Sequence, residues 1–202
     1  CKSVTGITIG PNVTNAGNMG NVCNWTVDSG RSPDDVRRRD DAGVFAMCDA
    51  LMNISVAAGT RVYASTEGVL FDRNRTTLIK FPPGRAGSYS IPDGVTKISS
   101  HGFSCCTGLT HVAIPSSTTT INDWAFSFCF GLEDLAIPAG VTHISRYAFN
   151  GCLGLTNISV DAGNRNFTSV DGVRFDKSAT RLLQYPPGRK GHYCFPSECT
   201  SI

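Results

Sequence analysis

The sequence contains few charged residues and no strong excess of either sign. Asp, Glu, Lys and Arg make up 17% of its 202 residues, against about 25% in an average soluble domain. The 18 basic residues nearly balance the 16 acidic ones, which gives no support to a nucleic-acid or polybasic membrane partner, since such a domain is strongly basic. No apolar run approaches the roughly 18 residues that a membrane-spanning helix needs. We therefore expect no nucleic-acid partner and no membrane span in this chain.

Signals for targeting and for catalysis are also missing. The chain opens at Cys1 without the apolar segment of a secretory signal peptide, so we expect either a processed mature chain or a fragment. No C-x-x-C motif indicates zinc, and no histidine has a partner at a spacing that favours a general base. We expect no enzymatic activity, no catalytic residue, no metal ligand and no cofactor. The histidines, interpreted as surface residues, are His101, His111, His143 and His192.

Glycine and proline are abundant instead, with 21 and 10 residues, which favours short strands and turns. An internal repeat of 23 residues has the pattern I-P-x-x-V-T-x-I-x-x-x-A-F-x-x-C-x-x-L-x-x-I-x. Its three ungapped copies are Ile91–Ala113, Ile114–Ala136 and Ile137–Ser159. A second repeat relates residues 54–98 to 158–202 at an offset of 104, with 22 identities in 45 positions.

The spacing within the repeat predicts the fold. Successive side chains of a strand point to opposite sides, so Leu155 and Ile158 face inward and Asn157 faces outward. One repeat cannot bury its apolar side alone, and stacked neighbours must complete the core. We predict a leucine-rich-repeat solenoid with short parallel strands on one face, irregular coil and turns on the other, and a period of 23 residues.

The whole chain, 1–202, is expected to form one solenoid. Residues 1–53 are degenerate N-terminal repeats with an irregular insertion at 15–44. Residues 54–202 are regular repeats, within which 54–98 is duplicated at 158–202.

These motifs resemble the BspA-like (Treponema-type) leucine-rich repeat family. The match is close over 45–202 and weak over 1–44. It includes a longer insert, which here reads Ser65–Phe71 with Leu78–Pro82, and Ser169–Phe175 with Leu182–Pro186. The resemblance implies a secreted or surface-attached, non-enzymatic protein used for adhesion or interaction.

Nine cysteines are many for a chain of this length. Five share one repeat position and are interpreted as a ladder of buried thiols, rather than a metal or redox stack, because a free cysteine behaves as a small hydrophobic residue. These are Cys1, Cys48, Cys106, Cys129 and Cys152. The other four are possible disulfide partners, with three connectivities open. Cys194 and Cys199 are closest in sequence, which leaves Cys23 with Cys105.

Six asparagines are followed at the second position by Ser or Thr, as N-glycosylation requires. They are Asn12, Asn24, Asn53, Asn74, Asn157 and Asn166. Their number indicates a secreted eukaryotic glycoprotein carrying N-linked glycans. The alternative is a bacterial solenoid, rich in Ser, Thr and Asn, in which such sites arise by accident. Asn53 and Asn157 are equivalent in the 104-residue repeat and are expected to face outward from strands.

Two functions are compatible with these patterns. The first is adhesion or recognition, with other proteins or glycans as partners, at an extracellular or cell-surface location. The second is a structural subunit of an extracellular glycoprotein filament, in which copies stack head to tail through uncapped ends. The outward strand positions are small or polar and lack the aromatic anchors of tight protein sites.

Overall fold

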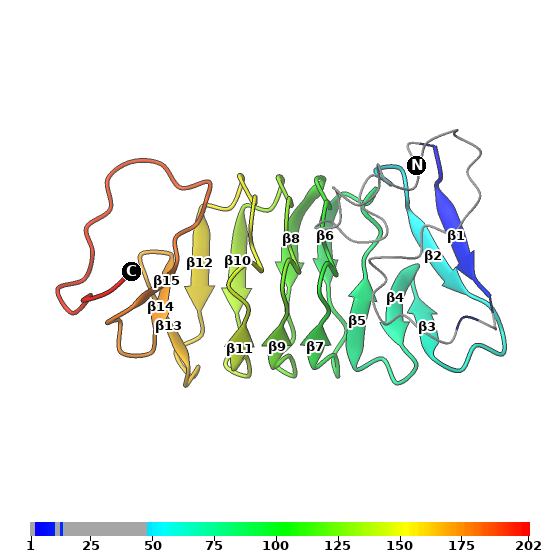
Figure 1. Cartoon of the computed structure of the whole chain (residues 1–202), viewed down its shortest axis with the longest axis horizontal. Helices are drawn as coiled ribbons and strands as arrows, with labels where there is room; N and C mark the ends of the chain where they lie inside the picture. The colour runs from blue at the N-terminus through cyan, green and yellow to red at the C-terminus, as the bar shows by residue number, and fades with distance from the viewer. Residues whose placement is uncertain (1–2, 11–12, 14–47) are drawn as a thin grey trace, which may run out of the picture.

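The computed structural model describes residues 3–10, 13 and 48–202. These residues form a solenoid whose coils lie side by side along its long axis (Figure 1). One side of the solenoid, which we call the front face, carries strands that pair in parallel. They are β1 (Gly6–Ile9), β2 (Asn53–Val56), β6 (Gly87–Ser90), β8 (Leu109–Ala113), β10 (Asp134–Ile137) and β12 (Asn157–Val160). The opposite side carries the short strands β7 (Lys97–Ile98), β9 (Thr120–Ile121) and β11 (His143–Ile144).

Strand pairing confirms the predicted solenoid and its 23-residue period. Thr120 of β9 pairs in parallel with Lys97 and with His143, one repeat before and one repeat after it. On the front face, Asp134 pairs with Asn157 at the same spacing. The back is more regular than the expected coil, because β7, β9 and β11 form a parallel ladder of their own.

Proline follows the front strands β6, β8 and β10, directly or after one residue. Proline donates no backbone hydrogen bond and fixes its own φ, so the chain turns away from the sheet after Ala113 and Ile137. The turns that follow are closed by Thr118 N donating to Pro115 O at 3.0 Å and by Val141 N donating to Pro138 O at 3.2 Å. Val141 then returns to the core, fully buried.

A file of phenylalanine rings fills the middle of the coils. Phe103, Phe126 and Phe149 have no exposed surface. The ring centroids of Phe103 and Phe126 lie 4.8 Å apart with an interplanar angle of 3°, and those of Phe126 and Phe149 lie 5.7 Å apart. Phe81 continues the file, 5.2 Å from Phe103. Each coil therefore covers the ring of the next.

Two antiparallel hairpins interrupt the regular coils, one in each copy of the 104-residue unit. The first comprises β3 (Tyr63–Thr66), β4 (Val69–Asp72) and β5 (Thr77–Lys80); the second comprises β13 (Phe167–Val170), β14 (Val173–Asp176) and β15 (Leu182–Gln184). The turns between the first two strands are Glu67–Gly68 and Asp171–Gly172, with φ of 49°, 74°, 46° and 74°. Paired positive φ values are those of a type I′ hairpin turn.

The two hairpins join the back ladder differently. Strand β5 pairs in parallel with β7, so the first hairpin extends the ladder into a six-stranded sheet of order β11-β9-β7-β5-β4-β3. The second hairpin forms a separate three-stranded sheet. The ladder therefore stops at β11, and the second hairpin lies beyond it.

The N-terminal part is described only in pieces. Strand β1 pairs in parallel with β2, with Gly6 opposite Asn53 and Ile9 opposite Val56. The predicted irregular insertion at 15–44 lies outside the described residues. Within 3–10, 13 and 48–202 we find no helix with the length and apolar character that crossing a bilayer takes.

Four of the repeat-position cysteines are buried: Cys48, Cys106, Cys129 and Cys152. The Sγ atoms of Cys129 and Cys152 donate to the carbonyl oxygens of Phe103 and Phe126 at 3.0 and 2.8 Å. Burial, helped by contact with the thiols on either side, raises the pKa of Cys129. The fifth, Cys1, lies outside the described residues.

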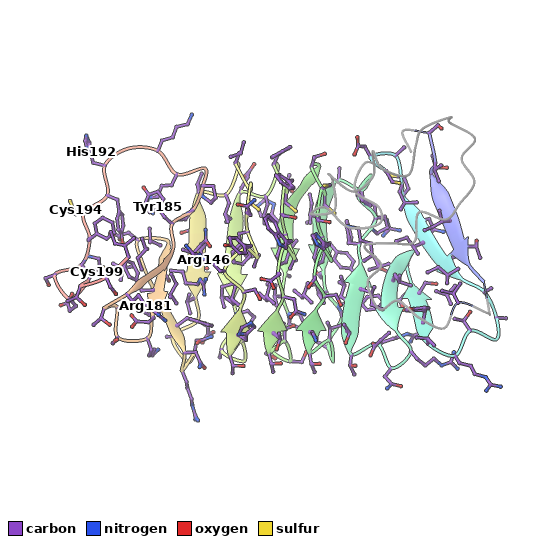
Figure 2. All side chains as sticks on the ribbon, viewed as in Figure 1. Arg146, Arg181, Tyr185, His192, Cys194 and Cys199 are labelled. Atoms are coloured by element: carbon purple, nitrogen blue, oxygen red, sulfur yellow. The ribbon has the colours of Figure 1, made fainter. Side chains whose placement is uncertain are left out.

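Of the other four cysteines, the structure describes three. Cys105, Cys194 and Cys199 are free thiols, so the bridge predicted between Cys194 and Cys199 is not formed. Cys23, the predicted partner of Cys105, lies outside the described residues. Figure 2 shows Cys194 and Cys199 on the extended loop at the C-terminal end of the solenoid.

The phenylalanine file predicts a large effect of one truncation. Replacing Phe126 by alanine removes contacts to both neighbouring rings and should lower the free energy of unfolding by about 3–5 kcal/mol. Phe130→Ala, at a ring that is 47% exposed, should cost less than about 1 kcal/mol. Urea denaturation followed by circular dichroism measures both. Equal losses in the two variants would contradict the stacked core.

The thiols should differ sharply in reactivity. A thiolate is the reactive species, and burial raises the pKa of Cys129 and Cys105, so both form thiolate only at higher pH than an ordinary cysteine. A short maleimide pulse at neutral pH should label the exposed Cys194 at least about tenfold more than Cys129, as measured by peptide mass spectrometry. A pulse in denaturant serves as the control and should label both. Equal labelling of the native protein would rule out the buried ladder.

Candidate functional site

The outward side chains of the front face are small or polar. Asp134 lies opposite Asn157, and Ala136 lies opposite Ser159. The row also contains Ser88 of β6, opposite His111, a strand that the sequence analysis did not predict. A front face of this kind offers little apolar contact area, and the outward positions of its described strands lack the Trp, Tyr and Arg anchors of strong binding sites.

One contact between a histidine and a carboxylate lies on this face. His111 Nε2 is 3.1 Å from Asp134 Oδ1, and the two side chains are 54% and 52% exposed. Exposed pairs of this kind contribute at most about 1 kcal/mol. The pair therefore marks a solvated surface and gives no reason to expect chemistry there.

The asparagines of the glycosylation motifs lie on the surface where the structure describes them. Asn53 and Asn157 begin β2 and β12 on the front face, and both are exposed. Asn74 and Asn166 lie in exposed loops next to the hairpins. Asn12 and Asn24 lie outside the described residues. Glycosylation of these sites stays a prediction.

The four histidines are not brought together. His143 Nε2 is 3.3 Å from Ser145 Oγ, His192 is exposed, and His101 stacks on Trp124. Among the residues that the structure describes, no group of three or more His, Cys, Asp or Glu side chains could hold a metal ion.

A second file of rings lies on the surface, where the chain leaves the back ladder. His101 and Trp124 stack with centroids 6.4 Å apart and an interplanar angle of 7°, and Trp124 and Tyr147 with centroids 5.2 Å apart and an angle of 13°. The Arg146 guanidinium lies 5.8 Å from the Tyr147 ring centroid. We call His101, Trp124 and Tyr147 the aromatic file. Tyr147 is 47% exposed, and the other two are partly exposed.

The sequence analysis missed the aromatic file, although its signal was present. The three residues are spaced by 23 and follow β7, β9 and β11 at the same repeat position. Because the repeat pattern leaves that position variable, three different aromatic residues did not stand out. The predicted lack of aromatic anchors holds for the front face but not for this side of the solenoid.

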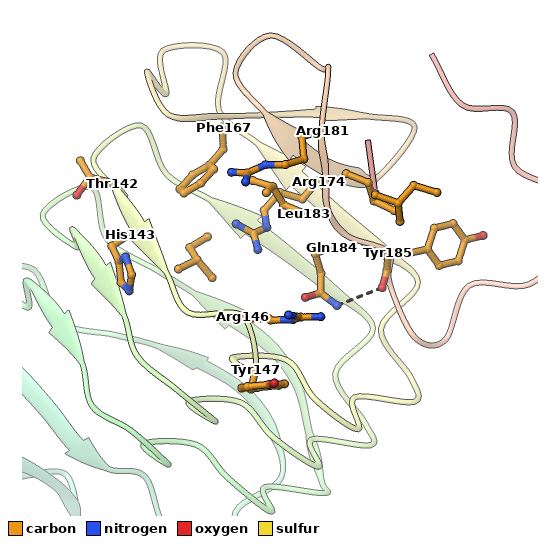
Figure 3. A pocket seen from close by; sticks show the side chains of 13 residues that line it. Thr142, His143, Arg146, Tyr147, Phe167, Arg174, Arg181, Leu183, Gln184 and Tyr185 are labelled. Carbon is orange, nitrogen blue, oxygen red and sulfur yellow. Dashed lines mark hydrogen bonds between the residues drawn. The ribbon is translucent and has the colours of Figure 1, made fainter. Parts of the chain in front are cut away.

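The aromatic file ends at an open pocket of about 700 Å³. The pocket lies between β11 and the second hairpin, where the back ladder stops (Figure 3). Figure 3 shows Arg174 and Arg181 entering from the hairpin beside Phe167, and Arg146 between Tyr147 and Gln184. Its volume falls in the range of about 300–1,000 Å³ typical of ligand sites. We call it the Arg174 pocket.

Arg174 is the most unusual side chain of this pocket. It is only 2% exposed, and its Nε is buried without a hydrogen-bond partner. Its guanidinium lies 5.0 Å from the centroid of the Phe167 ring, a cation–π contact. Desolvation lowers the pKa of Arg174 to about 10, so the group is still charged at neutral pH.

Lys80 of the first hairpin is also a buried cation, but its hydrogen-bond donors all have acceptors, unlike the Nε of Arg174. Its Nζ donates to His101 O at 2.9 Å and to Ser104 O and Oγ at 3.0 Å each. Three acceptors match the three donors of an ammonium group. At the equivalent position of the second hairpin, the sequence has Gln184, and the cation lies instead at Arg174.

The internal duplication provides a direct comparison for Arg174. At the offset of 104, Arg174 corresponds to Leu70 and Phe167 to Tyr63. Leu70 and Tyr63 are fully buried in an apolar cluster with Leu51. At this place of the fold the first copy has a leucine packed in an apolar cluster, and the second copy has an arginine that lines a pocket.

Comparison with known proteins agrees with this architecture. Residues 85–200 match the model of the BspA-type leucine-rich repeat region in six copies. A leucine-rich repeat protein from Eubacterium ventriosum is 26% identical with a TM-score of 0.61, over 79% of this chain and 37% of that protein. A leucine-rich cell surface protein from Faecalibacterium prausnitzii is 24% identical with a TM-score of 0.51, over 71% and 42%.

The chain spans less than half of the length of these two structures. A search of curated proteins finds no match. The family model covers more than half of the sequence. The chain therefore belongs to the BspA-type leucine-rich repeat family.

Proposed function

We propose that this chain is part of an extracellular or cell-surface protein that binds other proteins for adhesion or recognition. The observation that carries the proposal is the aromatic file, which presents His101, Trp124 and Tyr147 at one repeat position across three coils. Trp, Tyr and Arg are the residues that most often dominate binding energy at protein interfaces, and Arg146 lies directly beside the last ring.

Stacking also prepares these rings for binding. Each ring is held by its neighbour in the next coil, and the coils are held by the core beneath. A partner that contacts the file therefore immobilises few side chains, which keeps the entropic cost of association low. Solenoids commonly use such extended surfaces for recognition.

The family membership supports an interaction role, because leucine-rich repeat proteins are typically non-enzymatic interaction proteins. The name of the Faecalibacterium prausnitzii structure describes a cell surface protein, which favours the same location here. N-linked glycans on exposed asparagines such as Asn53 and Asn157 would cover the front face and leave the aromatic file accessible. Stacking of copies into a filament stays a prediction of the sequence.

The aromatic file should be the binding surface. An array of purified extracellular proteins, probed with the fluorescently labelled chain, identifies the partner, and titration then gives its Kd. Trp124→Ala and Tyr147→Ala should each weaken that Kd at least about tenfold, because truncating an anchor residue of an interface costs about 2 kcal/mol or more. Circular dichroism confirms that each variant is folded.

Leu153→Ala is the matched control, since Leu153 is apolar, 64% exposed and not part of the aromatic file. It should leave the Kd unchanged within about twofold. Failure to find any extracellular partner would refute the interaction role. A partner whose Kd is insensitive to both ring substitutions would place the binding surface elsewhere.

Glycosylation can be tested on protein secreted by the native cells. Treatment with a peptide N-glycosidase should lower the intact mass and convert occupied asparagines, such as Asn157, to aspartate. The variant Ser159→Ala removes that site while leaving Asn157 in place, and it should lower the untreated mass by one glycan. An unchanged mass after treatment would favour accidental motifs in a bacterial solenoid.

A further inference from the structure

The Arg174 pocket concentrates positive charge in a chain that is nearly neutral overall. Arg146, Arg174 and Arg181 line it, and no Asp or Glu is among the described residues of its lining. None of the three guanidinium groups forms an ion pair within the described part of the chain. A chain with a net charge of +2 thus places three unneutralised cations around one cavity.

Burial of the Arg174 cation lowers the stability of the unliganded protein. A buried cation without a counter-charge loses its hydration and gains little in return, and the buried Nε of Arg174 has no acceptor. The equivalent Leu70 shows that an aliphatic residue fits the same place in the fold. An anion bound in the pocket would supply the missing counter-charge.

The geometry of the donors favours carboxylates. A guanidinium presents a planar fork of N–H groups that matches the two oxygens of a carboxylate. Arginines on both sides of the pocket, Arg146 on one and Arg174 with Arg181 on the other (Figure 3), can hold more than one carboxylate at once. Gln184, from the same hairpin as Arg174, adds a side-chain amide to the lining of the pocket.

The remaining lining favours a peptide over a sugar. Ile144, Leu182 and Leu183 provide aliphatic contacts, which suit an apolar side chain next to an acidic one. A sugar ring packs best on an open aromatic face. The Phe167 ring is covered by Arg174, and the Tyr147 ring stacks on Trp124 and lies next to the Arg146 guanidinium.

We propose that the Arg174 pocket binds an acidic peptide segment of a partner protein. Asp or Glu carboxylates pair with Arg174 and the two flanking arginines, and an adjacent apolar side chain packs on Leu183. This inference rests on the proposed interaction role, since a protein partner supplies the segment. It adds the chemistry of that segment and a second contact point beside the aromatic file.

The test uses a fluorescein-labelled peptide, Glu-Leu-Glu-Glu-Leu-Glu, and its uncharged analogue, Gln-Leu-Gln-Gln-Leu-Gln. Fluorescence anisotropy at neutral pH and low salt should show the glutamate peptide binding the purified chain at least about tenfold more tightly than the glutamine peptide. Added sodium chloride should weaken the glutamate peptide, because salt screens exposed charge pairs.

Arg174→Leu is the decisive variant, because it restores the residue of the first copy. It should fold with an unchanged or higher urea midpoint and lose at least about tenfold in affinity for the glutamate peptide. Arg165→Leu is the matched control: it removes one exposed positive charge near the same hairpin, outside the pocket, and should change affinity less than about twofold. If Arg174→Leu does not fold, the exposed Arg181→Leu carries the same expectation of weaker binding.

Three results would overturn the proposal. They are equal binding of the two peptides, unchanged binding by the pocket variants, and displacement of the glutamate peptide by sodium glucuronate or phosphate at lower concentration than by unlabelled peptide. The last would identify a sugar acid or a small anion as the preferred ligand. The peptide test needs only the purified chain and is independent of the protein array. Failure of the peptide to bind would refute the acidic-peptide proposal without affecting the test of the aromatic file. Failure of the array to identify a partner would leave the peptide result valid.

Discussion

The regular coils of residues 91–159 depend on their neighbours to keep a phenylalanine ring out of water. A single 23-residue repeat is too small to enclose Phe126, and the ring is covered only because Phe103 and Phe149 lie on either side of it. The strands, the buried thiols and the proline turns all repeat with the spacing that this stacking imposes. Stability is thereby shared between adjacent coils rather than held by one central core.

The same periodicity acts on the surface. Whatever residue occupies a given outward position is placed next to its counterparts in the neighbouring coils, so a chance set of side chains becomes an ordered row. On the front face this produces small and polar rows with the pair of His111 and Asp134. After the back strands it produces the aromatic file. One constraint thus builds both the inert face and the candidate binding face.

The solenoid could be predicted from the sequence because its determinants are local and repeated. Phe126 and Cys129 recur at fixed positions, and period alone places them inside. The hairpins were missed, although Asp171–Gly172 carries the signal of a tight turn, because the strands around it depart from the repeat. The Arg174 pocket could not be predicted, since it lies between β11 and a hairpin whose separation depends on how two sheets end.

The interrupted back ladder also bears on how a repeat protein acquires new chemistry. Substitutions within a regular coil are limited by the neighbours that pack on both sides. The second hairpin is less constrained on the side that faces the pocket. There it has Arg174, where the first copy has Leu70. Both copies of the 104-residue unit carry the hairpin, so duplication of a unit that already contains it leaves one copy to maintain the apolar packing while the other can vary, and a lineage of these proteins could diversify its ligands while its coils stay the same.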